Sequence, residues 1–147
     1  MTIGKTTDET QIRELIEAWA KELRAKRVDA LMSHRAPDIL LYDLAPPLLH
    51  RGADTYRKGL QEWFATFQGP IGYDIRDLRI TAGDDVAFST SLNWIGGART
   101  NGDQTSVWVR TTMCFKKQRG EWIVMHEHVS VPFYMDGSDK AAIDLEP

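Results

Sequence analysis

The spacing of apolar residues changes once along the chain, near residue 70, and this change constrains the fold more than any other feature. Before it, apolar side chains recur every three to four residues; after it, they alternate with polar ones. The first spacing is typical of helices with one buried face, and the second is typical of half-buried strands. A helical first part followed by successive antiparallel strands predicts an α+β fold and disfavours alternating β-α-β units.

Three helices and one short strand are expected before residue 70. The first helix begins at Thr7–Asp8, whose side chains can accept hydrogen bonds from free backbone amides, and it ends near Lys26. Pro37 closes the second helix, because the residue before a proline is disfavoured in the helical conformation. The expected ranges are 7–26, 28–34 and 53–68 for the helices and 39–44 for the strand.

Strands fill the rest of the chain as far as about Val131. The alternation slips at Arg76–Asp77, which indicates a bulge, and Asn101–Gly102 is a strong hairpin signal. A chain of 147 residues has the length of one domain. We therefore expect a single domain over 1–147, with 1–7 and about 135–147 as terminal arms.

Composition excludes several classes of function. The chain has 18 basic and 21 acidic residues, its pI is about 5.8 and no basic run occurs, so no nucleic-acid partner is expected. No apolar stretch reaches the ~18–20 residues that span a bilayer, and the start lacks a signal-peptide pattern. The single cysteine, Cys114, permits no internal disulfide, which suits a reducing compartment. We expect a cytoplasmic protein without membrane attachment and, since no glycine-rich loop follows a strand, without a cofactor.

Two stretches of the strand-rich part resemble a known family. They are Trp-Val-Arg-Thr-Thr-Met-Cys-Phe at 108–115 and Trp-Ile-Val-Met-His-Glu-His-Val-Ser-Val-Pro-Phe at 122–133. With the helix order before them, they resemble the SnoaL-like, ketosteroid-isomerase-like branch of the nuclear transport factor 2-like superfamily. The resemblance implies a cone-shaped α+β barrel, with three N-terminal helices packed on a curved antiparallel sheet, and homodimers across the outer sheet face. Functions in the superfamily range from isomerases and dehydratases to non-catalytic domains, so the fold alone does not give the chemistry.

Asp43 is the first candidate for that chemistry. It shares a strand face with Ile39 and Leu41, and an acid among apolar groups has a raised pKa that suits proton transfer. The resemblance places Asp43 at the position of the isomerase general base. The alternative is that Asp43 caps the turn at Pro46–Pro47.

The resemblance also implies two hydrogen-bond donors for an enolate oxygen, and the corresponding residues here are Trp19 and Thr111. An indole nitrogen and a hydroxyl can each donate one hydrogen bond. Neither is a close substitute for the protonated acid that such a site uses. The sequence therefore disfavours steroid isomerisation.

Glu127 is the second candidate acid. It has the same parity on the last strand as Ile123 and Met125, so it either enters the cavity or pairs with a basic residue at the rim. In the cavity, a second carboxylate near Asp43 would raise one of the two pKa values. Both alternatives stay open.

His126 and His128 lie on the opposite strand face from Glu127. A His-x-His pair can chelate a metal, but no third ligand has a suitable spacing, so no metal is expected. We expect these histidines on the outer sheet face, in a dimer interface with Trp108 and Trp122. Residues 141–145 are expected to lie across the partner.

Several further residues are candidate contacts for a small hydrophobic molecule, although ordinary core residues have the same spacing. They are Trp19, Tyr42, Tyr56, Trp63, Phe88, Trp94, Thr111 and Met113. The favoured hypothesis is a cofactor-free isomerase or lyase that acts on a hydrophobic, carbonyl-bearing metabolite with Asp43 as general base. The alternative is a non-catalytic ligand-binding or dimerisation domain of the same fold.

Overall fold

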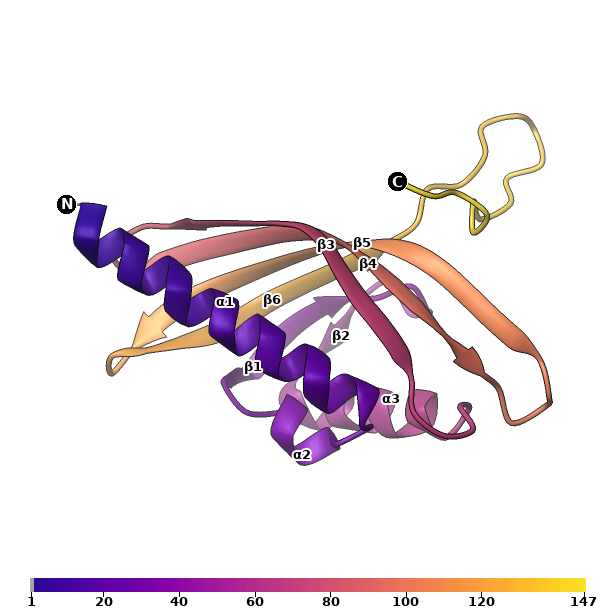
Figure 1. Ribbon diagram of the computed structural model, residues 1–147, viewed down its shortest axis with the longest axis horizontal. Helices are drawn as coiled ribbons and strands as arrows, with labels where there is room; N and C mark the ends of the chain where they lie inside the picture. Colours follow the sequence, from indigo (N-terminus) through magenta and orange to yellow (C-terminus); the bar gives the residue numbers. More distant parts are fainter. Residues whose placement is uncertain (1) are drawn as a thin grey trace.

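The computed structural model describes residues 2–147, with side chains from Thr7 onward (Figure 1). Three helices lie on one side of a curved six-stranded sheet, which confirms the α+β class. Within these residues, no helix has both the length and the apolar character needed to cross a bilayer. The elements are α1 (Thr2–Arg24), α2 (Val28–Leu31), β1 (Arg35–Tyr42), β2 (His50–Arg51), α3 (Ala53–Phe64), β3 (Gly72–Ala82), β4 (Val86–Ala98), β5 (Gln104–Gln118) and β6 (Glu121–Ser130).

The strand order is β2-β1-β6-β5-β4-β3, and two features differ from the expected barrel. The pair β1–β6 is parallel, with Leu40 opposite His126, so the sheet is mixed rather than wholly antiparallel. The order also leaves β2 and β3 as edges, so the sheet is open. The expected hairpin at Asn101–Gly102 joins β4 to β5, and the register shift in β3 confirms the bulge at Arg76–Asp77.

The first helices and strand have other boundaries than expected. α1 begins at Thr2, before the Thr7 start that the sequence indicated. α2 ends at Leu31, before the expected end at His34, and His34 itself adopts a left-handed conformation with φ of 60°. β1 then includes Pro37, which is tolerated because β2 pairs only with the far end of β1 and leaves Pro37 at a sheet edge.

A second bulge, in β6, decides which of its side chains face the helices. Cys114 lies opposite His126, whereas Phe115 lies opposite Val124, so one residue, Met125, is extra on β6. The alternation therefore reverses there. Trp122 points into the core with 2% of its surface exposed, and it does not lie on the outer face as expected.

Strand β4 has one polar and one apolar face. Ser89, Ser91 and Asn93 face the helices, and Ser89 and Asn93 are buried, whereas Phe88 and Trp94 lie on the outer face. The indole of Trp94 lies against two paired glycines, and a Cβ atom at either would approach it within 2.6 Å. The strand alternates as expected, but its polar stripe faces the interior.

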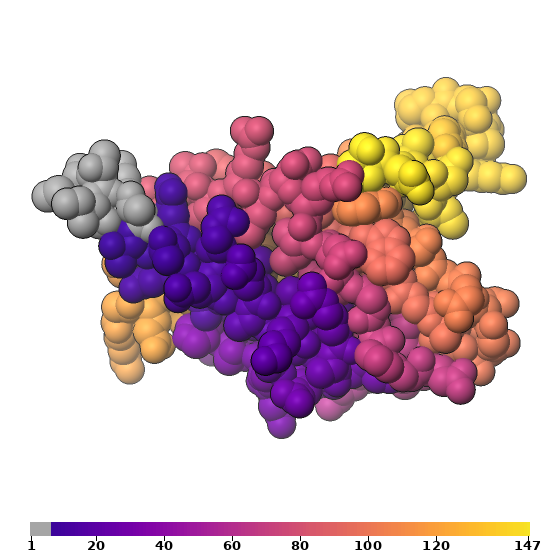
Figure 2. All heavy atoms as spheres, in the orientation of Figure 1, coloured from indigo at the N-terminus to yellow at the C-terminus, as the bar shows by residue number. Residues whose placement is uncertain are grey.

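Residues 131–147 form a hooked arm beyond β6. A bridge between Phe133 and Ala141 closes it, and Ala142 is buried against its base with a hydrogen bond to the carbonyl oxygen of Pro132. The arm stands on the side of the sheet opposite α2 and α3 (Figures 1 and 2). It leaves Phe133 and Met135 exposed.

Replacing Gly96 with alanine is expected to displace the Trp94 indole, because the new Cβ would lie 2.5 Å from its ring. The expected loss of unfolding free energy is about 1 kcal/mol, at the low end for overpacking, since the indole is only partly buried and can move. Chemical denaturation followed by tryptophan fluorescence measures this loss. Gly59→Ala in α3 is the control: no atom lies within 4 Å, and a gain of about 0.5–1 kcal/mol is expected. Equal effects of the two substitutions would contradict the steric role of Gly96.

Candidate functional site: a polar cavity between sheet and helices

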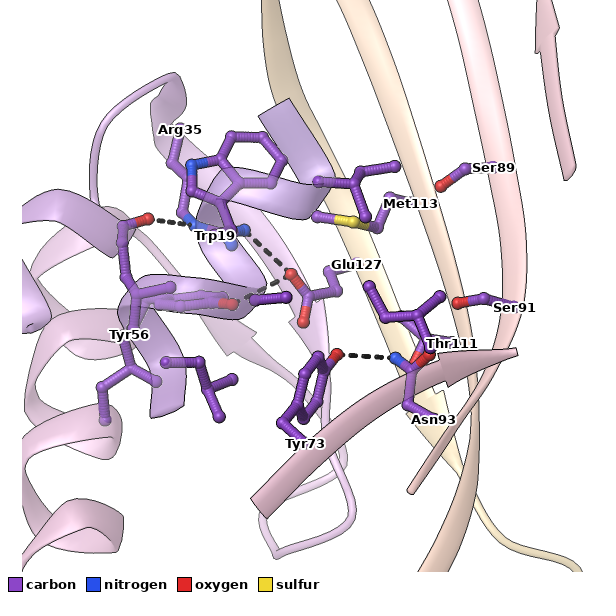
Figure 3. Close-up of a pocket in the computed structure, with 16 residues that line it drawn as sticks. Trp19, Arg35, Tyr56, Tyr73, Ser89, Ser91, Asn93, Thr111, Met113 and Glu127 are labelled. Atoms are coloured by element: carbon purple, nitrogen blue, oxygen red, sulfur yellow. Dashed lines mark hydrogen bonds and ion pairs between the residues drawn. The ribbon is translucent and has the colours of Figure 1, made fainter. Parts of the chain in front are cut away.

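A cavity lies between the inner face of the sheet and helices α1 and α3 (Figure 3). About 60 Å³ of it is open to the centres of water molecules, which is room for several waters or one small molecule. Its walls are apolar on the helix side and polar on the strand side. The lining residues are Ile16, Trp19, Ala20, Leu23, Leu31, Arg35, Tyr56, Leu60, Tyr73, Ile75, Ser89, Ser91, Asn93, Thr111, Met113 and Glu127.

An ion pair between Arg35 of β1 and Glu127 of β6 forms one end of the cavity. The Arg35 Nη1 donates to Glu127 Oε1 over 2.8 Å, and the Tyr56 hydroxyl donates to the same oxygen over 2.9 Å. No described residue donates to the other oxygen, Oε2, and Figure 3 shows the carboxylate directed into the cavity. One oxygen of Glu127 is therefore fixed, and the other is available to a ligand.

The guanidinium of Arg35 is surrounded by partners. Its Nε donates to the carbonyl oxygen of Leu31 over 2.7 Å, and its central carbon lies 4.9 Å from the Trp19 ring centroid and 4.7 Å from that of Tyr56. Burial opposes the charge, but Tyr56 and Glu127 outweigh this effect and raise the pKa of Arg35 above its ordinary value. Arg35 thus provides a permanent positive charge beside the Glu127 carboxylate.

A second polar group on the strand side consists of Asn93, Tyr73 and Thr111. The Asn93 Nδ2 donates to the Tyr73 hydroxyl over 2.7 Å and to Thr111 Oγ1 over 2.9 Å. Burial and, next in size, the negative charge of Glu127 raise the pKa of Tyr73 well above its ordinary value, so its hydroxyl stays protonated at neutral pH. Because both hydroxyl oxygens accept from Asn93, both hydroxyl protons can be donated elsewhere.

Five of the predicted site residues line this cavity, and five do not. The lining residues are Trp19, Tyr56, Thr111, Met113 and Glu127. Glu127 was expected either to enter the cavity or to pair with a basic residue, and it does both: it faces the cavity and pairs with Arg35. The residues outside are Tyr42, Asp43, Trp63, Phe88 and Trp94.

Asp43 lies outside the cavity because β1 ends at Tyr42, one residue earlier. Its side chain is exposed, and its Oδ1 accepts a hydrogen bond from the backbone amide of Leu44 over 2.8 Å. This local contact is the kind that the turn-capping alternative implied. The structure therefore contradicts the expected placement of Asp43 among apolar groups.

The other four residues lie elsewhere for simple packing reasons. Tyr42 is on the outer face, with its ring centroid 4.8 Å from that of His126 and 5.3 Å from that of His128. Trp63 packs on Phe64 and Phe67 at the end of α3. Phe88 and Trp94 belong to the apolar outer stripe of β4, which sequence reasoning assigned to the interior.

The two histidines lie on the outer face as expected. His126 Nδ1 is 2.7 Å from the carbonyl oxygen of Leu40. Within the described part of the chain, no group of three His, Cys, Asp or Glu residues is placed to hold a metal ion.

Sequence reasoning missed five polar residues of the cavity: Arg35, Tyr73, Ser89, Ser91 and Asn93. A signal for three of them was present, because Ser89, Ser91 and Asn93 form a polar stripe at strand spacing in a segment whose other stripe is apolar. Such a stripe is compatible with either a solvent-facing or a cavity-facing side. Arg35 gave no signal, since its partner Glu127 is 92 residues away.

The comparisons with known proteins agree with this architecture. The model of the SnoaL-like domain family matches residues 12–134. The chain belongs to the SnoaL-like family. No curated protein matches the sequence at a significant level.

Several solved structures resemble this SnoaL-like chain. A nuclear transport factor 2-like protein of unknown function from Pseudomonas putida KT2440 is 30% identical, with a TM-score of 0.88, over 97% of this chain and 98% of that one. A ketosteroid isomerase-like protein from Erwinia carotovora atroseptica SCRI1043 is 18% identical, with a TM-score of 0.72, over 84% and 95% of the two chains. A nuclear transport factor 2-like superfamily protein from Salmonella enterica serovar Typhimurium is 15% identical, with a TM-score of 0.77, over 91% and 97%. The last two show the fold alone.

Arg35→Met is expected to lower the free energy of unfolding by about 3–5 kcal/mol, because it leaves the Glu127 carboxylate without its positive partner. The double variant Arg35→Met/Glu127→Leu removes both charges and is expected to recover most of this loss. Chemical denaturation of the three proteins measures both effects. A double variant no more stable than Arg35→Met would show that packing around Arg35, rather than the charge pair, determines the loss.

Proposed function

We propose that the protein binds a small carbonyl-bearing molecule in this cavity and catalyses a cofactor-free proton transfer on it, with Glu127 as the proton acceptor. The observation that supports this proposal most is the asymmetry of Glu127. Two donors hold one oxygen, while the other faces the cavity with no partner among the described residues. A base must have a fixed position and a free lone pair, and Glu127 has both.

The proposed step begins with a carbon acid next to the ligand's carbonyl group. Glu127 Oε2 takes a proton from that carbon; the electron pair of the broken C–H bond forms a C=C bond to the carbonyl carbon, and the pair of the carbonyl π bond moves onto the oxygen. The hydroxyls of Tyr73 and Thr111 lie across the cavity from Glu127 and can donate to that oxygen as its charge grows (Figure 3). Where a further C=C bond is conjugated with the enolate, return of the proton to the far carbon gives an isomer; where the β-carbon bears a leaving group, re-formation of the C=O bond expels that group with its electron pair and gives a lyase product.

A non-catalytic ligand-binding domain is the second candidate, and the Arg35–Glu127 pair favours it. The two charged groups lie 2.8 Å apart, and a buried ion pair of this kind can have a purely structural role. The same pair would still orient a polar ligand. The two candidates therefore share the ligand and differ in whether a proton moves.

Glu127→Gln is expected to reduce proton exchange at the α-carbon of an enolisable ketone by ~10²–10⁴-fold, the usual effect of removing a positioned base. Loss of α-proton signals in D₂O, followed by ¹H NMR over a panel of small ketones, measures the exchange without knowledge of the natural substrate. Asp43→Asn is the matched control, because it makes the same carboxylate-to-amide change outside the cavity. Unchanged exchange in Glu127→Gln, or an equal loss in Asp43→Asn, would contradict the role of Glu127.

We also propose that a second copy of the chain covers the outer face of the sheet. Two apolar side chains there are exposed, Val86 with 57% and Phe88 with 47% of its surface, and the partly buried Trp94 and Trp108 lie on the same face. The hooked arm stands on this side and adds the exposed Phe133. Exposed apolar side chains gathered on one face of a sheet are typical of a surface that another protein covers.

Light scattering is expected to give the mass of a dimer at micromolar concentration. Phe88→Glu places a charge in the centre of the proposed interface and should shift the protein to monomer, with its circular dichroism spectrum retained. Ala18→Glu, on the exposed side of α1, is the control and should leave the dimer intact. A monomeric unmodified protein would refute the proposed dimer.

A further inference from the structure

The amide of Asn93 is incompletely satisfied, although its side chain is among the most buried polar groups of the protein. Only 2% of the residue is exposed, and it lines the cavity. Both hydrogen bonds that its Nδ2 can donate are made, to Tyr73 and Thr111. Its Oδ1 is buried and has no partner. A buried acceptor without a donor is uncommon in folded proteins, and an unfilled ligand position is one reason for it.

The neighbours of Asn93 are complementary to this oxygen. The hydroxyl oxygens of Tyr73 and Thr111 accept from Asn93, so their protons are free for an acceptor in the cavity. The Asn93 amide, with its unpartnered Oδ1, thus lies beside two hydroxyls that can act as donors (Figure 3). A simple ketone can use the donors but leaves Oδ1 unsatisfied.

We infer that Asn93, Tyr73 and Thr111 select ligands that carry an N–H or O–H donor next to a carbonyl acceptor, such as a carboxamide or an α-hydroxy ketone. This inference rests on the proposed function only in taking the cavity as the ligand site. The ligand's carbonyl oxygen accepts from the Tyr73 or Thr111 hydroxyl, and its adjacent donor reaches Asn93 Oδ1. Ser89 and Ser91, on the same face of β4, extend this polar wall.

The test compares two probes of equal size, benzamide and acetophenone, in NMR titrations of the isotope-labelled full chain. Both have a phenyl ring and a carbonyl oxygen, but only benzamide adds an N–H donor. Benzamide is expected to bind about tenfold more tightly, the effect of one additional hydrogen bond to a buried acceptor. This comparison needs no substitution, so it holds whether or not a variant folds.

Asn93→Asp then tests the residue itself. A carboxylate at this position accepts from both hydroxyls and turns their protons away from the cavity, so the preference for benzamide should disappear. Asn101→Asp is the matched control, because it makes the same change in the β4–β5 hairpin, and it should keep the tenfold ratio.

Equal affinities of the two probes for the unmodified protein would overturn the inference, and so would a crystal structure from a benzamide soak with only water on Asn93 Oδ1. These outcomes are distinct from failure of the proposed function. A tenfold preference for benzamide together with absent α-proton exchange would retain the selection by Asn93 and refute catalysis by Glu127.

Discussion

The buried charge of Arg35 imposes more on this fold than any other single group. Removing a guanidinium from water is costly unless every part of it finds a partner. Here the partners come from different elements: the Glu127 carboxylate from β6, the Leu31 carbonyl oxygen from the end of α2, and the rings of Trp19 and Tyr56 from α1 and α3. Arg35 therefore makes all of these contacts only when the four elements are packed together as they are here. The same arrangement fixes Glu127 at the end of the cavity.

The neighbouring strands explain why Glu127 rather than Asp43 occupies that position. Leu41 of β1 is in register with Glu127 of the parallel strand β6. Asp43 has the same parity as Leu41, so the periodic argument placed it correctly in principle. The strand ends at Tyr42, however, and the carboxylate of Asp43 falls beyond the edge of the cavity. A parity rule holds only as long as the strand continues.

Much of the fold followed from the sequence because it depends on local signals. The α+β class, the bulge at Arg76–Asp77 and the hairpin at Asn101–Gly102 each rest on spacing or turn chemistry within a few residues. The parallel pair β1–β6 did not follow, since pairing across the whole chain has no local signature. The β6 bulge at Met125 also places Trp122 on the opposite face from the one expected, and no residue type near Met125 indicates a bulge.

The site was harder to predict because alternation defines two faces of a strand without saying which one is inside. In β4 the apolar stripe was assigned to the interior, but a chain that lines a polar cavity inverts the usual rule: Asn93 and Ser89 are buried, and Phe88 is exposed. This inversion has a chemical consequence. Two polar groups line the cavity: the Arg35–Glu127 pair, and Asn93 with the hydroxyls of Tyr73 and Thr111. On the helix side, the cavity is lined by apolar residues such as Leu23 and Leu60. For the ligand that we propose, this distribution favours an orientation with its polar atoms toward the strands and its apolar surface toward α1 and α3, so the cavity would orient it before the proposed proton transfer.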